Sequence, residues 1–285
     1  MFSSDSGDVG LAASDGGLLS GAPPDCDPGL VERRFGVVGC RAEGALLRSV
    51  MRTGTWMNDS SGREQVGALG VLLDHVLGEI FYTTRARDQW SLTTELAFDV
   101  IAPPPWNTTV LYAVSWVPRG ERTQGFAQAE VMDDSGTLLA VGTTRIQYVA
   151  ASASPPEAGH VGEIASRAAN FAEHLGIRIS SDTETTRVEL PDTQDWGNLY
   201  GVLHGGIWAG MAETAAAEAF ARRGGLRTAH VHVSYLRQSS PGASIRVDAR
   251  PVHCGRLFGL MEVIGADDTG RQCVKAMVTG RRYEP

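Results

Sequence analysis

Two long apolar segments dominate the hydrophobic pattern of this chain. The first begins at Val66 and reads VGALGVLLDHVLGEIF, and the second begins at Gly205 and reads GGIWAGMAETAAAEAF. Both are apolar on nearly all faces, with one acid in the middle, Asp74 in the first and Glu213 in the second. Because a helix that is apolar nearly all round must be buried, each segment predicts a helix at the centre of a hydrophobic core.

Segments with strand character follow each predicted helix. They alternate polar and apolar positions and are rich in β-branched residues, which predicts strands. The first half carries them at 92–102, 109–117, 125–133 and 138–149, and the second at 228–236, 244–252, 257–265 and 273–283. The tetrapeptides DDSG at 133–136 and DDTG at 267–270 lie between strands and predict hairpin turns.

The two halves also repeat one another. Asp74 and Glu213 lie 139 positions apart, and at that spacing Gly67 matches Gly206 and Gly62 matches Gly201, as Asp59 matches Asn198. The two turns match at a spacing of 134, a five-residue difference that loops tolerate. Each half therefore predicts a long helix wrapped by a curved antiparallel sheet. This is an α+β fold, a tandem or double hotdog.

Composition sets the expected boundaries of the two units. Residues 1–34 are rich in Gly, Ser, Asp, Ala and Pro and predict a flexible N-terminal tail. The stretch AASASPPEAG at 150–159 predicts a linker. The two domains are then expected at 35–149 and 160–285.

Charge and cysteine content exclude several classes of function. The net charge of −8 and the pI near 5.4 argue against a nucleic-acid partner. We find neither a signal peptide nor an apolar run long enough for a membrane span, so the cytoplasm is the expected compartment. The four cysteines, at 26, 40, 254 and 273, lack CxxC spacing, and we expect no metal site, redox pair or bound cofactor.

The candidate chemistry lies just before the second helix, where Asn198 is followed by His204-Gly205-Gly206. The first amides of a helix have no intrahelical partner and point out of the positive end of the helix dipole. Glycine lets a ligand approach them closely. A carbonyl oxygen placed there would be polarised, and an oxyanion would be stabilised.

Glu213 lies seven residues beyond Gly206, about two turns or ~10 Å along the same face. Side chains lean toward the helix N-terminus, so we expect the carboxylate to tilt back toward the glycine amides. Its apolar surroundings should raise its pKa. Simpler interpretations stay open: the glycines and Asn198 as turn residues, His204 as a structural histidine, and Glu213 as a solvated side chain.

The pattern N-x5-HGG-x6-[DE] before an Ala-rich helix resembles hotdog thioesterases of the phenylacetic-acid-pathway and 4-hydroxybenzoyl-CoA thioesterase type. The resemblance covers both halves from about residue 40 to the end of the chain. It implies hydrolysis of acyl-CoA thioesters, with coenzyme A as part of a small-molecule substrate. It also implies that Glu213 is the general base or nucleophile and that Gly205 and Gly206 polarise the carbonyl. Asn198 and His204 fall on the family's polar positions.

Two departures from the family pattern bear on the site. Family members with a helix glutamate often carry Ser or Thr four residues later, where this chain has Ala217. The family's sites are completed by a partner subunit, so the first half should supply that part here. Thr93 and Thr94, on its first strand, are the candidates.

The first half keeps only part of the motif. Gln65 and Val66 stand in place of His204 and Gly205, whereas Gly67 and Asp74 keep a glycine and the acid. A second site is expected at Asp74, with Gln65 and Gly67 near its substrate. The sequence favours an active and an inactive site there equally. His230 and His232 are expected to face it, unless they are structural.

Two other functions are compatible with the sequence. His75 beside Asp74 permits a hotdog hydratase or dehydratase, although the Asp-x-Asn-Pro-x-His pattern of those enzymes is absent. A non-catalytic acyl-CoA-binding protein or sensor is the other, although residues 1–34 lack the helix-turn-helix pattern and basic run of sensors. A fused pair is equivalent to a dimer, and we expect such units to associate into homo-oligomers.

Overall fold

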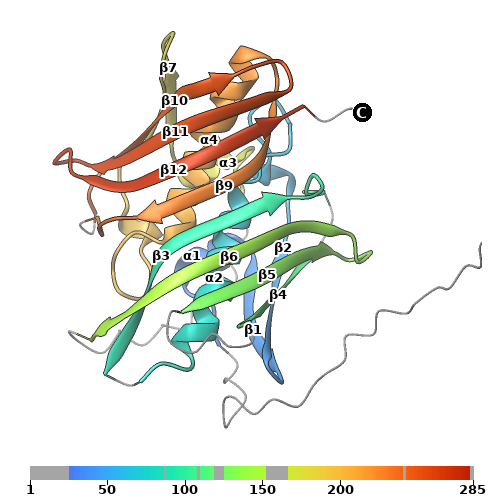
Figure 1. Cartoon of the computed structure of the whole chain (residues 1–285), viewed down its shortest axis with the longest axis vertical. Coiled ribbons are helices and arrows are strands. Elements are labelled where there is room, and N and C mark those ends of the chain that lie inside the picture. Colours follow the sequence, from blue (N-terminus) through green and yellow to red (C-terminus); the bar gives the residue numbers. More distant parts are fainter. Residues whose placement is uncertain are drawn as a thin grey trace, which may run out of the picture.

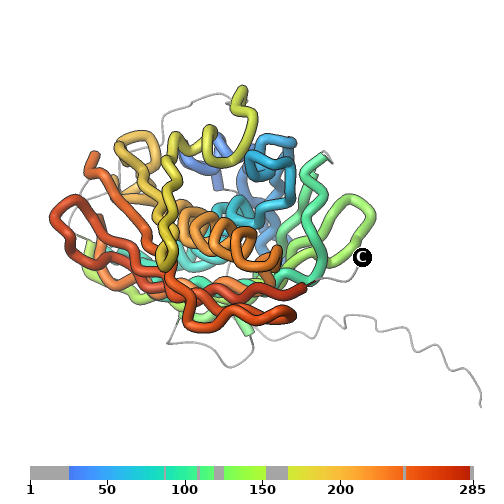
Figure 2. Tube along the Cα trace, turned by 90° about the horizontal axis from the view of Figure 1, so that it is seen from above, coloured from blue at the N-terminus to red at the C-terminus, as the bar shows by residue number. Residues whose placement is uncertain are grey.

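The computed structural model describes residues 26–86, 88–107, 110–118, 125–151, 166–239 and 242–282. These residues form a 12-stranded sheet in the order β1-β2-β4-β5-β6-β3-β9-β12-β11-β10-β8-β7. The sheet curves around two long helices, α2 and α4, which lie together on its concave side (Figures 1 and 2).

The two halves contain the same elements in the same order. The first half contains α1 (Leu30–Arg34), β1 (Val37–Glu43), β2 (Leu46–Arg52), a short 3-10 helix (Thr55–Met57), α2 (Gly67–Tyr82), β3 (Gln89–Val100), β4 (Val110–Trp116), β5 (Phe126–Asp133) and β6 (Leu138–Ala150). The second contains α3 (Phe171–Leu175), β7 (Arg178–Ser181), β8 (Thr186–Leu190), a short 3-10 helix (Gln194–Trp196), α4 (Gly205–Arg223), β9 (Arg227–Tyr235), β10 (Ile245–Cys254), β11 (Phe258–Asp267) and β12 (Gln272–Arg281).

The predicted helices and turns are confirmed. α2 and α4 coincide with the two apolar segments, and most of their residues are buried on every side. In both predicted turns an aspartate carboxylate, Asp133 or Asp267, accepts the amide two residues on. The glycine that ends each turn has positive φ, 83° at Gly136 and 79° at Gly270, a conformation that glycine adopts without strain.

The sheet has more strands than the sequence predicts. β1 and β2 precede α2, and β7 and β8 precede α4, so each half has six strands in the described residues. β2 buries Leu47, Ser49 and Met51 on one side, and its other positions are polar or half-exposed. Because Ser49 interrupts the inward apolar series, the period-2 signal is weak there.

The expected tail boundary at residue 34 is wrong. Residues 26–34 belong to the fold, because Val31 of α1 and Phe35 just after it are fully buried in the core. Residues 1–25, the rest of the predicted tail, lie outside the described residues, as do 152–165, which include most of the predicted linker.

A local two-fold axis relates the halves. β3 pairs antiparallel with β9, and the register joins Glu95 to Ser234, Ala97 to His232 and Asp99 to His230. Adding 135 to each β3 residue of these pairs gives a β9 residue of the same set: Glu95 leads to His230, Ala97 to its own partner His232, and Asp99 to Ser234. The pairing is therefore symmetric about Ala97 and His232. The six strands of one half thus continue into the equivalent six of the other.

The histidines at this seam do not face Asp74, contrary to our expectation. His230 Nδ1 lies 3.0 Å from Asp99 Oδ1, and His232 Nε2 lies 3.8 Å from Glu95 Oε2. Val231 and Val233, which alternate with them, are fully buried. Successive side chains of a strand point to opposite faces, so both histidines lie on the outer face of the sheet.

The two long helices cross antiparallel at a contact made by glycines. A Cβ on Gly206 would lie 2.5 Å from Val71 Cα, and one on Gly67 would lie 3.1 Å from Gly210 Cα. Only glycine permits this approach. As a result, the N-terminus of each helix lies beside the middle of the other. Neither helix, nor any other in the described residues, has the length and apolarity needed to cross a membrane.

Candidate active sites

Each central acid faces the N-terminus of the opposite helix. The Gly206 amide at the start of α4 donates to Asp74 Oδ2 at 3.0 Å, and the first amides of α2, at Val66 and Gly67, lie near Glu213. The expectation that Glu213 tilts back toward Gly205 and Gly206 is therefore wrong. The antiparallel crossing brings the other helix's N-terminus closer to each acid than its own, which is two turns away.

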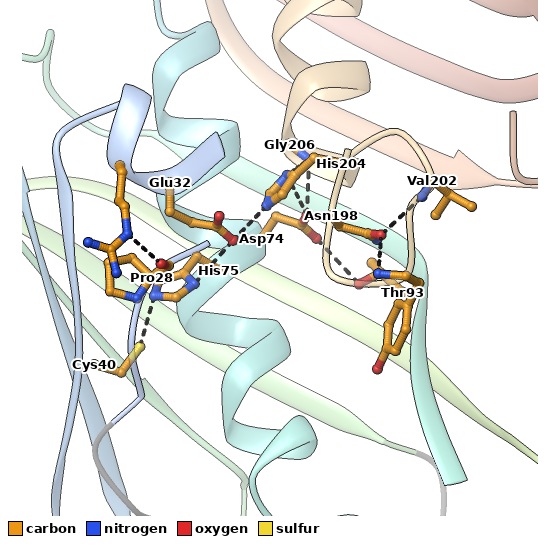
Figure 3. Close-up of polar contacts among 12 residues, drawn as sticks. Pro28, Glu32, Cys40, Asp74, His75, Thr93, Asn198, Val202, His204 and Gly206 are labelled. Atoms are coloured by element: carbon orange, nitrogen blue, oxygen red, sulfur yellow. Dashed lines mark hydrogen bonds and ion pairs between the residues drawn. The ribbon is translucent and has the colours of Figure 1, made fainter. Parts of the chain in front are cut away.

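The Asp74 site gathers several donors around one carboxylate (Figure 3). Besides Gly206, the hydroxyl of Thr93 donates to Asp74 Oδ1 at 3.3 Å, and His204 Nδ1 lies 3.2 Å from Oδ2. A Cβ on Gly205 would lie 2.8 Å from Oδ2. The carboxylate thus occupies the anion position at a helix N-terminus, where the dipole stabilises negative charge.

His204 links this carboxylate to a second, partly buried acid, Glu32 of α1. Its Nε2 lies 3.0 Å from Glu32 Oε1. Burial lowers the pKa of His204, but the negative charges of Glu32 and Asp74 outweigh burial and raise it above its usual value. Burial likewise raises the pKa of Glu32, yet His204 holds it well below its usual range. Glu32 and His204 therefore form a buried ion pair behind Asp74.

The α4 N-terminus is capped in either state of His204. The neutral ring accepts the Gly206 amide at Nδ1, 3.0 Å away, and the protonated ring donates from Nδ1 to Asp74. Tyr235 donates its hydroxyl to the Gly205 carbonyl at 2.8 Å. Burial, together with the charge of Asp74, raises the pKa of Tyr235 well above its usual value, so it stays a neutral donor. Neither Glu32 nor Tyr235 was predicted, because no local motif connects them to the helix.

Two predicted residues have structural roles outside the sites. Asn198 Oδ1 accepts the amides of Tyr200 and Val202, at 2.9 and 3.3 Å, and so shapes its own loop. Asp59, its equivalent in the first half, does the same for its loop. Thr94 lies at a register irregularity of β3 and donates to the Arg145 carbonyl rather than to Asp74.

The Glu213 site has fewer donors. The carboxyl group is 1% exposed and accepts the Thr228 hydroxyl at Oε1, 2.7 Å away. Within the described part of the chain, Oε2 makes no hydrogen bond of normal geometry. Burial raises the pKa of Glu213 to about 7, although Thr228, Gln65 and the amides of Val66 and Gly67 lower it in part.

Gln65 occupies the position that His204 holds in the other half, and it forms hydrogen bonds with Thr214 and Trp106. Its Nε2 donates to Thr214 Oγ1, and its backbone carbonyl accepts Trp106 Nε1 at 2.8 Å. Val66, the N-cap of α2, has no side-chain cap. The first amides of α2 therefore interact with Glu213 rather than with a side-chain cap, and an acceptor from outside the chain would compete with Glu213 for them.

A pocket that is open to solvent lies over Glu213. Thr228 and Ala217 line it, so the small Ala217 that departs from the family pattern leaves space beside the acid. Its other lining residues come from both halves: Asp59, Ser60, Arg63, Glu64, Gln65, Val66, Val100, Pro103, Pro104, Ala172, Ile179, Thr214, Glu218, Leu226 and Arg227. A ligand of mixed apolar and polar character would fit such walls.

Known proteins resemble this chain in sequence and in fold. The model of the thioesterase superfamily matches residues 200–274, which include His204, Gly205, Gly206 and Glu213. The proofreading thioesterase EntH of Klebsiella pneumoniae is 30% identical over 109 residues, which cover 35% of this chain and 76% of that protein.

Solved structures show the same fold over most of the chain. A provisionally assigned thioesterase from Novosphingobium aromaticivorans has a TM-score of 0.57 at 16% identity, covering 85% of this chain and 100% of its own. The 12:0-ACP thioesterase of Umbellularia californica has a TM-score of 0.56 at 12% identity, covering 84% and 98%. An acyl-ACP thioesterase from Bacteroides thetaiotaomicron has a TM-score of 0.55 at 14% identity, covering 83% and 98%.

The fold is therefore of the hotdog type found in thioesterases. EntH adds a match in sequence that spans most of its own length. By these comparisons, the chain belongs to the thioesterase superfamily.

Proposed function

We propose that this protein hydrolyses acyl thioesters and that Glu213 is its catalytic base. One observation carries the proposal: Glu213 is a buried carboxyl group with a pKa raised to about 7, and it lines a pocket opposite the first amides of α2. A general base works best when its pKa lies near the working pH. The unpaired Oε2 is the atom that would accept a proton from water.

The reaction follows from the positions of these groups. The thioester carbonyl would accept the amides of Val66 and Gly67, whose donors stabilise the oxyanion as it forms. Glu213 would take a proton from water, the hydroxide equivalent would attack the carbonyl carbon, and the carbon–sulfur bond would break. The leaving thiolate then receives the proton. Thr228 would hold Glu213 Oε1 and leave Oε2 toward water.

The Asp74 site is the second candidate for the same reaction, favoured by its His204-Gly205-Gly206 sequence. The Gly206 amide already contacts Asp74, so acid and oxyanion donor meet there as well. A substrate carbonyl would have to displace the carboxylate from that amide. The hydratase alternative depends on His75. This residue points away from the site, with Nε2 at 3.2 Å from Cys40 Sγ.

We further propose that each half is one unit of a double hotdog, with both sites formed between the units. The shared strand order and the two-fold register at the seam support this. Association of such chains into homo-oligomers, and a cytoplasmic location, remain proposals from the sequence.

The proposed substrate is an acyl group on a phosphopantetheine thiol. Acyl-CoA is the form that the sequence resemblance implies, whereas two structural neighbours are named for acyl carrier protein. Arg63 and Arg227 at the pocket are paired with Asp59 and Glu64, at 2.9 and 3.2 Å, so both arginines already have carboxylate partners. The carrier is best decided by experiment.

Thiol release from purified protein tests the proposal. A panel of acyl-CoA and acyl-carrier-protein thioesters of increasing chain length would be incubated with the wild-type chain, beside the Glu213→Gln variant. We expect release from at least one thioester series and a large loss in the variant. Absence of release from every thioester, with the substrate still bound, would favour the binding-protein alternative instead.

A further inference from the structure

A cluster of Cys26, Cys40 and His75 lies outside both candidate active sites. Cys26, near the start of the described residues, forms a two-way backbone bridge with Cys40 of β1, at 3.2 and 3.1 Å. His75 of α2 places Nε2 at 3.2 Å from Cys40 Sγ (Figure 3). The two sulfur atoms and a ring nitrogen of His75 all lie within 4.8 Å of one another.

These three groups have the chemistry and spacing of a zinc site. Zinc takes thiolate sulfur at about 2.3 Å and imidazole nitrogen at about 2.0–2.1 Å, in tetrahedral geometry. Ligand atoms at those distances lie on the order of 3.5 Å apart, close to the separation seen between Cys40 and His75. We propose that Cys26, Cys40 and His75 bind a zinc ion.

The second ring nitrogen of His75 supports the assignment. With Nε2 toward the sulfur atoms, Nδ1 faces Glu32 Oε1 at 3.5 Å, slightly beyond hydrogen-bond length. The ring is 1% exposed, and Nδ1 has no closer partner among the described residues. Histidines that bind zinc commonly donate their other N–H to a carboxylate, which orients the ring. Glu32 is placed to serve as that carboxylate.

The three side chains would leave one position of a tetrahedral site open, and a water molecule would complete it. Cys26 is half-buried, so an ion could reach the cluster from outside.

The proposed ion would join three separate parts of the first half: the segment before α1, strand β1 and helix α2. Its role there would be structural, because the same segment leads into α1, which carries Glu32 to His204. This site could not be predicted from the sequence, because the three ligands are far apart along the chain and lack a close spacing motif.

The same two cysteines permit a competing state, a disulfide. In a hydrogen-bonded antiparallel pair the Cα atoms are about 5.5 Å apart, which falls within the range that disulfides span. A disulfide would need no imidazole nitrogen beside the sulfur atoms and no carboxylate behind the ring. The position of His75 therefore favours the metal, and the experiment separates the two states.

The test measures zinc in the full-length protein, purified with reduced thiols. We expect about one zinc per chain, lost in Cys26→Ser and kept in the matched control Cys254→Ser, whose thiol is also half-buried but lies on β10. Cobalt loaded in place of zinc should show a thiolate charge-transfer band in wild type and control. Zinc should also raise the melting temperature of the wild type and of Cys254→Ser, but not that of Cys26→Ser.

Three results would overturn the proposal: reduced wild type that takes up no zinc, Cys26→Ser that keeps it, or a Cys26–Cys40 disulfide in protein isolated with its thiols blocked at lysis. Cys40 is buried, so Cys40→Ser would disturb the packing of the core as well as the proposed site. Cys26 is half-buried, so Cys26→Ser tests the site without that disturbance. The readouts are metal content, spectrum and melting temperature, so the outcome is independent of thioester hydrolysis.

Discussion

The Asp74 and Glu213 sites share one plan and differ in how the acid is satisfied. Asp74 is surrounded by the Gly206 amide, the Thr93 hydroxyl and the His204 ring, with Glu32 behind. Glu213 accepts the Thr228 hydroxyl, also interacts with Gln65 and the first amides of α2, and has a pKa raised to about 7. The two equivalent carboxylates are therefore held differently: Asp74 accepts hydrogen bonds of normal length from several donors, whereas Glu213 is more deeply buried and accepts one such bond.

The residues at the helix N-termini account for the difference. In α4, His204 caps the helix and approaches Asp74. In α2, Val66 offers no side-chain cap, and Gln65 is directed to Thr214. The better-preserved motif thus surrounds Asp74, whereas the altered motif faces Glu213, the acid that lines the pocket.

The largest expected effect is on activity. Glu213→Gln should lower kcat/KM by about 10²-fold to 10⁴-fold, the usual contribution of a positioned base. Asp74→Asn should change it by less than about tenfold, because the pocket and its acid remain. Steady-state thiol release measures both. The opposite ranking would make Asp74 the base and His204-Gly205-Gly206 the working oxyanion site.

The two acids should also differ in their effect on stability. The pKa of Glu213 is raised from its ordinary 4.5 to about 7, so the folded protein binds this proton more tightly than the unfolded chain does. The carboxyl group therefore costs no stability below pH 4.5, and it destabilises the fold increasingly as pH rises through 7. Glu213→Gln removes that destabilisation and should stabilise the protein at pH 8 by about 3 kcal/mol relative to pH 4.

Asp74→Asn should have the opposite sign, a loss of about 1–3 kcal/mol, because it weakens hydrogen bonds to a charged group. Urea unfolding at the two pH values, with both variants beside wild type, measures the contrast. Equal effects of the two substitutions at pH 8 would mean that the acids have similar environments.

The threonine that holds each acid gives a finer comparison. Thr228→Val removes the hydroxyl at 2.7 Å from Glu213 and should raise the pKa of that carboxyl further. The rise of kcat/KM with pH should move to higher pH, with a loss of about tenfold at pH 7. Thr93→Val, the equivalent change at 3.3 Å from Asp74, should leave the pH profile in place. A shift in both variants would tie both acids to turnover.

The smallest effect concerns the helices alone. Gly78 of α2 corresponds to Ala217 of α4, and a Cβ added to Gly78 would meet no atom within 4 Å. Gly78→Ala should raise the free energy of unfolding by about 0.5–1 kcal/mol, because glycine loses more conformational freedom on folding. Activity should stay unchanged. Gly206→Ala is the counterpart, since its Cβ would clash with Val71, and it should destabilise.

The sequence predicts the parts of this molecule that depend on local pattern. Helices α2 and α4 follow from their all-round apolar character, and the two turns follow from Asp and Gly at fixed positions. Several of the residues predicted for the site, Asp74, Glu213, Thr93, Gln65 and the glycines, lie together at the helix crossing, and their roles there stay predictions.

Their grouping was not predictable, because it depends on the crossing itself. The spacing from Gly206 to Glu213 suits a contact along one helix, and nothing local in the chain shows that α2 intervenes with Asp74. The role of Glu32 could not be predicted for a similar reason. It precedes the first strand in a polar stretch, and its role depends on Val31 and Phe35 anchoring α1 in the core.

The two-fold seam between β3 and β9 lies within a single polypeptide, and this has a consequence for inheritance. In a dimer of identical subunits, one change in the gene appears in both sites at once. Here a codon change reaches only one of them, as the contrast between Gln65 and His204 records. One polypeptide with two candidate sites thus lets each site change independently of the other, free to lose or gain a task on its own.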